Sequence, residues 1–172
     1  GPKDPPGGSW HVLIDRDGTM FQCVPLTLGA WHVGDRGEIA GHVWKNVNRA
    51  AIGVELENAG RLKASGGKYY AWPYWKRAPG KAPDPRLGPD PRFEIPAGRV
   101  VPSVSACTRP GSGGMRTIAA GSFDAYDMRQ IDSAKVLLDA LVACFGWHRD
   151  VCSYGHFMFS SQGKEDPGGL WM

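Results

Sequence analysis

The sequence has no apolar run long enough to cross a bilayer. Its longest apolar stretch, residues 136–147, is interrupted by Asp139 and is shorter than the roughly 20 residues that a membrane helix requires. No two of its cysteines, at positions 23, 107, 144 and 152, form a C-x-x-C pair, which excludes zinc-knuckle and thioredoxin-type motifs. Two states stay open for the cysteines: buried free thiols, or one or two disulfides formed in an oxidising compartment.

Strong net charge is also missing. The 172 residues contain 20 Lys and Arg against 17 Asp and Glu, a formal charge of +3, which is too small to identify an anionic partner. With 42% hydrophobic residues, the chain has the size and composition of one globular domain, residues 1–172, able to bury about 70% of its unfolded surface.

Three strands are expected in the first sixty residues. Residues 10–14 and 19–24 are typical of two strands, and the Asp17-Gly18 pair between them is typical of a hairpin turn. A third strand is expected over residues 51–57, where apolar positions 52, 54 and 56 alternate with Gly53, Glu55 and Glu57. This alternation predicts one packed face and one face that carries the carboxylates, so Glu55 should point away from the packed face.

One long helix is expected over residues 127–145. Its apolar positions 131, 134, 138, 141 and 145 form a single stripe, Asp127 and Gln130 are spaced like a capping box, and Gly146 is placed to end the helix. We therefore expect one face of this helix to pack on the sheet.

Residues 60–122 form a long segment rich in proline, glycine and aromatic residues. The prolines prevent long helices, although residues 93–101 could hold short strands. Within the segment, residues 68–77 place aromatic rings beside Lys and Arg, a composition suited to stacking on sugar rings or bases. The alternative is that these rings seal an insertion onto the rest of the domain, because a stretch of this length needs a small core of its own.

Near the end of the chain, His156 and Asp166 lie ten positions apart with Lys164 between them. An imidazole and a carboxylate suit zinc, whose catalytic sites use three protein ligands and leave one position for water. The lysine could stabilise an oxyanion beside the metal. The alternative is a loop histidine near a surface ion pair. We expect His11, His42 and His148 to be hydrogen-bonded structural residues.

Three blocks in this order carry a resemblance to a known family. They are Ser-Trp-His-Val-Leu-Ile-Asp-Arg-Asp-Gly-Thr at residues 9–19, Ala-Trp-His-Val-Gly at residues 30–34, and Ala-Ile-Gly-Val-Glu-Leu-Glu-Asn at residues 51–58. Together with His156, Lys164 and Asp166, the chain resembles the zinc-dependent N-acetylmuramoyl-L-alanine amidases shared by phage amidase-lysozymes, cell-wall recycling amidases and peptidoglycan recognition proteins. The resemblance covers the first sixty and the last fifty or so residues.

This resemblance implies an α/β fold in which helices flank a mixed central β-sheet, with residues 60–122 as an insertion. It implies a Zn²⁺ enzyme that cleaves the amide between N-acetylmuramic acid and L-alanine, with peptidoglycan or muropeptide as its partner and no nucleic acid. His156 and Asp166 match two zinc ligands. Glu55 matches the carboxylate that activates water, and Lys164 matches the residue that steadies the tetrahedral intermediate. Trp31, His32 and Asn58 match positions that line the substrate groove.

The pattern departs from the family in one place. In the family, the first zinc ligand is a histidine on a strand upstream of the one that corresponds to residues 10–14. No histidine precedes Trp10 in this sequence. Three explanations stay open: a preceding strand is missing from the sequence, a residue such as His32, His42 or Cys152 substitutes, or metal and catalysis are lost.

Two other functions stay open beside the amidase. The first is a module that binds muropeptides without cutting them. The second is a nucleic-acid binder that uses residues 69–77, whose affinity should fall steeply with salt. Localisation also stays open, although the resemblance favours a cell-wall-facing location, periplasmic, secreted or phage-delivered, over a purely cytoplasmic one.

Overall fold

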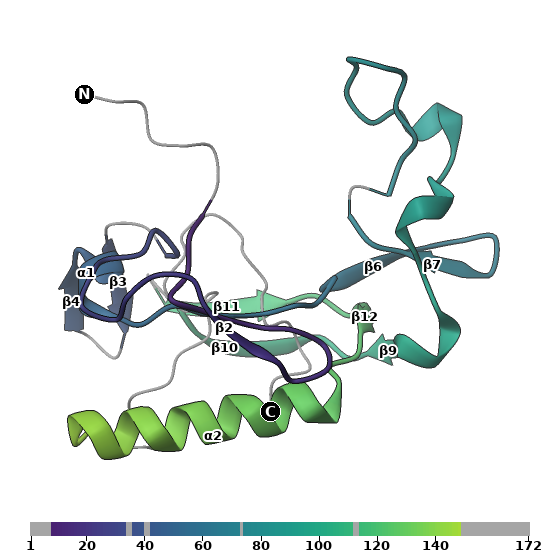
Figure 1. The fold of residues 1–172 in the computed structure, drawn as a ribbon. Coiled ribbons are helices and arrows are strands. Elements are labelled where there is room, and N and C mark those ends of the chain that lie inside the picture. Colours follow the sequence, from purple (N-terminus) through teal and green to yellow (C-terminus); the bar gives the residue numbers. More distant parts are fainter. Residues whose placement is uncertain (1–7, 34–35, 40–41, 73, 112–113, 149–172) are drawn as a thin grey trace. The chain divides into compact units, whose positions relative to one another are not determined.

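The computed structural model describes residues 8–33, 36–39, 42–72, 74–111 and 114–148. These residues fall into two compact units. The first contains residues up to Glu57 together with the helix that begins after Asp127, and the second contains residues 58–109 and 116–126. Figure 1 shows the elements of both units along the chain. Within the described residues, no helix is both long and apolar enough to span a membrane.

The first unit is built on a mixed three-stranded sheet in the order β2-β1-β5. The central strand β1 (Val12–Ile14) pairs antiparallel with β2 (Met20–Gln22) and parallel with β5 (Val54–Leu56). The predicted hairpin is confirmed, and Gly18 in its turn has a φ of 87°, a conformation that glycine adopts without strain. Buried Val12 and Ile14 of β1 belong to the core of this unit.

The parallel pairing of β1 and β5 requires a crossover, because parallel neighbours cannot be joined by a tight turn. This crossover contains a hairpin of β3 (Arg36–Ile39) and β4 (His42–Lys45), followed by the short helix α1 (Val47–Ala50). Val47 is 1% exposed and packs against Val33 and Ala51 in a small apolar cluster. The crossover therefore has its own anchor in the first unit.

The third predicted strand is confirmed as β5, but its two faces differ from the prediction. Val54, expected on the packed face, is 38% exposed. Gly53, expected on the carboxylate face, is buried. The reason is that the face at Gly53 is covered by an aromatic ring, which alternation along one strand cannot reveal.

The long helix α2 (Met128–Phe145) and both of its predicted ends are confirmed. Asp127 and Gln130 form the capping box, and Gly146 ends the helix in the left-handed conformation at a φ of 66°. Leu141 of the apolar stripe is buried. Phe145, the last residue of the stripe, is 47% exposed and stacks on Trp147 with ring centroids 4.8 Å apart.

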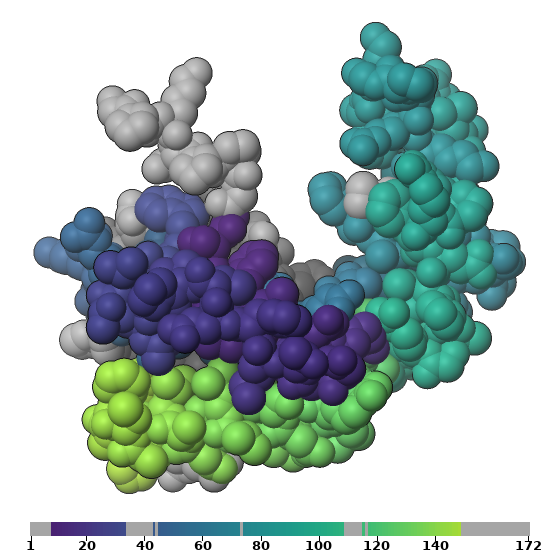
Figure 2. Space-filling model, in the orientation of Figure 1, coloured from purple at the N-terminus to yellow at the C-terminus, as the bar shows by residue number. Residues whose placement is uncertain are grey.

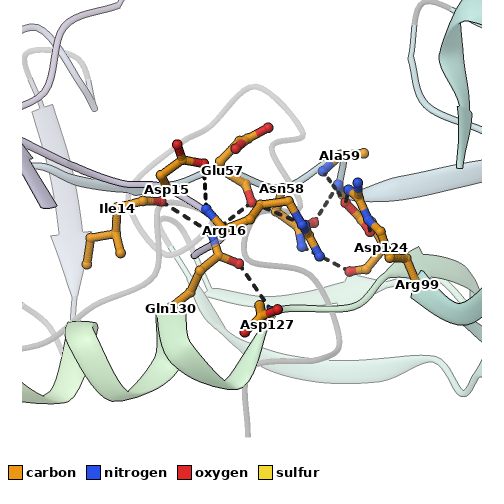
Figure 3. Close-up of polar contacts among 11 residues, drawn as sticks. Ile14, Asp15, Arg16, Glu57, Asn58, Ala59, Arg99, Asp124, Asp127 and Gln130 are labelled. Carbon is orange, nitrogen blue, oxygen red and sulfur yellow. Dashed lines mark hydrogen bonds and ion pairs between the residues drawn. The ribbon is translucent and has the colours of Figure 1, made fainter. Parts of the chain in front are cut away.

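Gln130 joins α2 to the sheet of the first unit (Figure 3). Its side chain is fully buried, and Nε2 donates to the carbonyl oxygens of Ile14 at 3.2 Å and Glu57 at 3.0 Å. Its Oε1 accepts from the backbone N–H of Asp127 at 3.2 Å. One amide therefore ties the helix start to the ends of the paired strands β1 and β5.

The second unit contains a five-stranded sheet in the order β8-β7-β6-β12-β9, in which all neighbouring strands are antiparallel. Its strands are β6 (Arg61–Ser65), β7 (Lys68–Tyr70), β8 (Glu94–Ile95), β9 (Val100–Val104) and β12 (Gly121–Asp124). A separate two-stranded pair of β10 (Cys107–Gly111) and β11 (Gly114–Ile118) is divided between the units, because residues 110–115 belong to the first. Three short 3-10 helices, Pro85–Leu87, Pro91–Phe93 and Ala97–Arg99, punctuate the loops. Within the described part of residues 60–122 there is no α-helix, as the prolines predict.

A buried ion pair holds the second unit together at the end of β12. Asp124 is fully buried and accepts from Arg99 Nε at 2.9 Å and Nη2 at 2.6 Å (Figure 3). Asp124 Oδ2 also accepts from the backbone N–H of Ala59 at 2.9 Å. These bonds compensate the carboxylate for its lost hydration, as a buried charge requires.

Two Asp-Pro-Arg turns shape the loop between β7 and β8. In each turn the aspartate caps a 3-10 helix and pairs with the arginine two positions on: Asp84 with Arg86 at 2.7 Å and Asp90 with Arg92 at 2.6 Å. Hydrogen bonds from Arg92 lower the pKa of Asp90 from 3.8 to about 2.

The three described cysteines, Cys23, Cys107 and Cys144, are free thiols. Cys23 and Cys144 are exposed, so the expectation of buried thiols is wrong for these two. Cys152 lies outside the described residues.

Replacing Gln130 by Leu should lower the free energy of unfolding by about 2–4 kcal/mol, because it removes three buried hydrogen bonds and leaves their backbone partners poorly satisfied. Urea unfolding measures this loss. Asp132→Ala, at an exposed position of the same helix, is the control and should stay within about 0.5 kcal/mol of the parent. A Gln130→Leu chain as stable as the control would contradict the anchoring role.

Asp90 should make stability fall at low pH. Because its folded pKa lies below its ordinary value, its contribution is present above about pH 4 and is lost as pH falls towards 2. In Asp90→Asn this part of the acid dependence should disappear from unfolding curves recorded between pH 5 and 2. Asp84→Asn, in the more exposed turn, should change the curve less. Identical curves for the parent and Asp90→Asn would refute the assignment.

Candidate functional site

Three of the predicted site residues, His156, Lys164 and Asp166, lie outside the described residues, as does Cys152. The others, Glu55, Trp31, His32 and Asn58, are described. The first three of these belong to the first unit, and Asn58 belongs to the second. Within the described part of the first unit, the candidate site therefore consists of Trp31, His32 and Glu55.

Glu55 is the central residue of β5, where it lies in register with Leu13 of β1. Its side chain is exposed, which agrees with the expectation that it points away from a packed interior. A carboxylate on a strand that is paired along its length has a fixed backbone position, which is what a general base needs.

The His32 ring lies against the backbone of Gly53. A Cβ placed on Gly53 would come within 2.5 Å of His32 Cγ, so only glycine allows this approach. Gly53 directly precedes β5, and Glu55 follows two positions later, which along a strand is the same face. The imidazole of His32 thus packs against the short segment that carries the carboxylate of Glu55.

Two further hydrogen bonds orient the His32 residue. Its Nδ1 lies 2.7 Å from the carbonyl oxygen of Ala30, and its backbone N–H donates to Asn48 Oδ1 at 2.9 Å. The same Asn48 oxygen accepts from the N–H of Val33 at 2.9 Å. Since a carbonyl can only accept, Nδ1 carries the proton in this arrangement. Buried Asn48 therefore holds the Trp-His-Val turn in place from α1.

His11 contacts both Gly53 and His32. It is 1% exposed, its Nδ1 accepts from the N–H of Gly53 at 2.9 Å, and its Nε2 donates to the carbonyl oxygen of Leu28 at 2.9 Å. Its ring meets that of His32 edge to face, with centroids 5.8 Å apart. The prediction that His11 is a structural histidine is confirmed. The side chain of His42 is not among those described, and His148 is exposed.

Trp31 is 48% exposed and borders a pocket of about 470 Å³ in the first unit. Its backbone is clamped to Ser9, whose hydroxyl accepts from the N–H of Trp31 at 2.8 Å. The other lining residues are Ser9, Gly29, Ala30, Asn46, Asn48 and Arg49. The pocket therefore joins an indole face to polar groups from α1 and the residue before it.

Asn58 has structural contacts in the second unit. Its Nδ2 donates to the carbonyl oxygen of Asp124 at 3.0 Å, and its Oδ1 accepts from the N–H of Gly60 at 2.7 Å. Both ends of this amide are thus bonded to the backbone, and Asn58 shapes the chain where it enters the second unit.

The carboxyl group at the end of β5 is electrostatically perturbed. A hydrogen bond that the protonated Glu57 carboxyl donates to Asp15, together with burial, raises the pKa of Glu57 above its ordinary value, and the nearby Arg16 partly offsets this (Figure 3). The protonated form of Glu57 is therefore favoured over that of an isolated glutamate. Glu57 directly follows β5 and lies two positions after Glu55.

No three His, Cys, Asp or Glu side chains within the described ranges come together as a group able to hold a metal ion. Both ring nitrogens of His11 are bonded to the backbone, which excludes His11 as a ligand. The bond from Nδ1 of His32 to Ala30 is compatible with metal binding through Nε2, but His32 is not part of such a group within the described residues. The described residues alone therefore do not form the zinc site.

The contacts of Gly53 and Asn48 with His32 were not predicted from the sequence. For Gly53 a signal existed, because a glycine inside a strand pattern often marks close approach by another group. For Asn48 the sequence carries no comparable signal, since its partners are backbone groups 15 and 16 positions away.

Gly53→Ala should displace the His32 ring and destabilise the first unit by about 1–3 kcal/mol through overpacking. Denaturant unfolding measures the loss, and His32→Ala in the same chain should recover most of it by making room. Gly98→Ala, where an added Cβ meets nothing within 4 Å, is the control. A loss that the second substitution fails to relieve would locate the strain elsewhere.

The candidate site lies in a part of the chain that is similar to a known family. Residues 3–86, just under half of the chain, match the family model described as N-acetylmuramoyl-L-alanine amidase. None of the curated proteins and none of the solved structures compared with the chain matches it. The mixed α/β architecture with small sheets and few helices is compatible with an amidase-like fold. The match supports an amidase-type function that acts on peptidoglycan.

Proposed function

We propose that this protein hydrolyses the amide bond between N-acetylmuramic acid and the L-alanine of the peptidoglycan stem peptide. The observation that carries the proposal is the short segment where Gly53 receives the His32 ring and Glu55 follows two positions later. This segment lies inside the stretch that matches the amidase family. The site is exposed at Glu55 and Trp31, so a polymeric substrate can reach both.

In this proposal Glu55 is the general base. Amide hydrolysis requires removal of a proton from the attacking water, and an exposed carboxylate on a fixed strand can accept it. His32 lies on the same face, and its oriented ring lines the place where the substrate binds. Trp31 offers an indole face suited to packing on a sugar ring.

Zinc is the proposed cofactor, held by His156 and Asp166 together with a third ligand. Imidazole nitrogen and carboxylate oxygen are the ligand types of catalytic zinc sites. When bound, zinc would supply a Lewis acid and lower the pKa of bound water to about 7. Lys164, two positions before Asp166, is the proposed donor to the oxyanion that develops on the substrate carbonyl.

Incubation of the chain with purified peptidoglycan should release stem peptides that begin with a free L-alanine amino group. Mass spectrometry detects these peptides, and a zinc chelator should abolish their release while added zinc restores it. Chelator-sensitive release supports the zinc amidase. Release that the chelator leaves unchanged would refute the zinc, and no release from any peptidoglycan preparation would refute the amidase.

Glu55→Gln should lower the rate of release by about 100-fold or more, because it removes the general base without changing the size of the side chain. Glu94→Gln, a carboxylate in the second unit that pairs with Lys68, is the matched control and should keep the parental rate. Metal content measured on both variants should equal that of the parent. Full activity in Glu55→Gln would remove Glu55 from the chemistry.

A further inference from the structure

The small net charge of the chain conceals a large imbalance along it. Residues 58–126 contain eleven Lys and Arg against four Asp and Glu, a formal charge of +7, while the rest of the sequence carries −4. The described part of this segment is almost entirely the second unit. The second unit is therefore strongly basic, although the whole chain is not.

All four carboxylates of this segment are engaged by cations of the same unit. Asp84 pairs with Arg86, Asp90 with Arg92, Glu94 with Lys68 and Asp124 with Arg99, at distances between 2.6 and 2.8 Å. The positive excess therefore lies on the remaining cations. Among these, four are exposed and form none of the close ion pairs found within the described residues: Lys63, Lys76, Arg77 and Lys81. Of the four, Lys76 acts on Asp90 through its charge without a close contact.

These four cations gather around the loop of residues 71–93. Lys76, Arg77 and Lys81 belong to the loop. Lys81 ends a turn that begins directly after Arg77 and is closed by a bond from the N–H of Lys81 to the carbonyl oxygen of Ala78 at 3.0 Å. Lys63 reaches it from β6, with Nζ 5.9 Å from the centre of the Trp75 ring. The positive charge is thus concentrated on one loop and the strand beside it.

The loop is closed on itself rather than open. Backbone bonds join Ala71 to Phe93 at 2.8 Å, Tyr74 to Asp90 at 2.8 Å and Lys76 to Gly88 at 3.0 Å. The two Asp-Pro-Arg turns lie in the half of the loop that leads back to β8. Figure 1 shows this loop in blue-green, extending from the β6–β7 hairpin, and Figure 2 shows its surface in the same colours. A loop that is already ordered loses little entropy when it binds a ligand.

The loop also presents aromatic rings. Trp72 is 74% exposed, the largest exposed fraction among the large apolar side chains of the described residues. Close to it in sequence, Tyr74 and Trp75 pack edge to face with ring centroids 5.4 Å apart. Burial of Trp72 would be favourable, so on an ordered loop its exposed ring is available to pack against a ligand.

We propose that the loop of residues 71–93, together with Lys63, is an anchoring surface for the peptidoglycan of the cell wall, in which sugar rings alternate with attachment points of stem peptides that carry carboxylates. Sugar rings stack on Trp72, and the carboxylates of the polymer pair with Lys63, Lys76, Arg77 and Lys81. This inference rests on the proposed function for the choice of polymer, and it assigns to the second unit a binding step separate from hydrolysis.

Nucleic acid is the competing ligand, because stacking rings and cations also suit single strands. Two observations favour the glycan. The matched amidase segment runs to residue 86 and so includes most of the loop, and the loop displays one highly exposed ring rather than the series of rings on which successive bases stack.

Sedimentation with purified, insoluble peptidoglycan tests the anchor. The full chain carries Glu55→Gln in every sample so that the polymer stays intact. On this background Trp72→Ala, and separately Lys76→Glu with Lys81→Glu, should each weaken binding by about tenfold. The charge variant should also flatten the dependence of binding on salt, because exposed ion pairs are screened.

Lys135→Glu, an exposed cation on α2, is the matched control and should keep binding within about twofold of the background chain. Parental binding in both loop variants would overturn the proposal. It would also be overturned if the loop variants lost affinity for an oligothymidylate of about 20 nucleotides while keeping their affinity for peptidoglycan. A parent chain that binds peptidoglycan but releases no peptide would refute the amidase and leave the anchor standing.

Discussion

The first unit depends on one close contact, the approach of the His32 ring to the backbone of Gly53. The same glycine donates its N–H to His11 and accepts, through its carbonyl oxygen, the N–H groups of His11 and Val12. Both backbone polar groups of Gly53 are therefore hydrogen-bonded, and the His32 ring occupies the space where a side chain would stand. Because β5 starts at the next residue, the contact fixes where the parallel strand pairs with β1 and hence where Glu55 stands.

The constraint spreads outward through buried amides rather than through a large apolar core. Asn48 receives the N–H groups that follow Trp31, and Gln130 ties the start of α2 to the ends of β1 and β5. Each of these amides is at least 95% buried and bonds to backbone groups distant in sequence. Hydrogen bonds have strict geometry, so such amides specify position more sharply than apolar contacts of the same area. A site built on them is well oriented even though the sheet that carries it has only three strands.

The features of the fold that depend on neighbouring residues could be predicted from the sequence. The β1–β2 turn follows from Asp17-Gly18, and both ends of α2 follow from Asp127, Gln130 and Gly146. Prediction from the sequence failed where a distant group decides the outcome, as at the two faces of β5. The single-domain expectation for residues 1–172 and the roles of His156, Lys164 and Asp166 stay predictions. In residues 60–122, the pairings of β7 with β8 and of β12 with β6 join residues 20 or more positions apart, as does the ion pair of Lys68 with Glu94, and periodicity does not reveal them.

The pairing of carboxylates in the second unit has a consequence for function on an insoluble polymer. Local Asp-Arg pairs in the two turns use the acidic groups to shape the backbone, so they do not cancel the charge of Lys63, Lys76 and Arg77. An exposed surface of this kind binds a polyanion by many weak, salt-screened contacts. Such contacts raise the local concentration of substrate for a catalytic site on the same chain. Because each contact is weak, a protein bound in this way can also leave one strand for the next, which a single tight site would prevent.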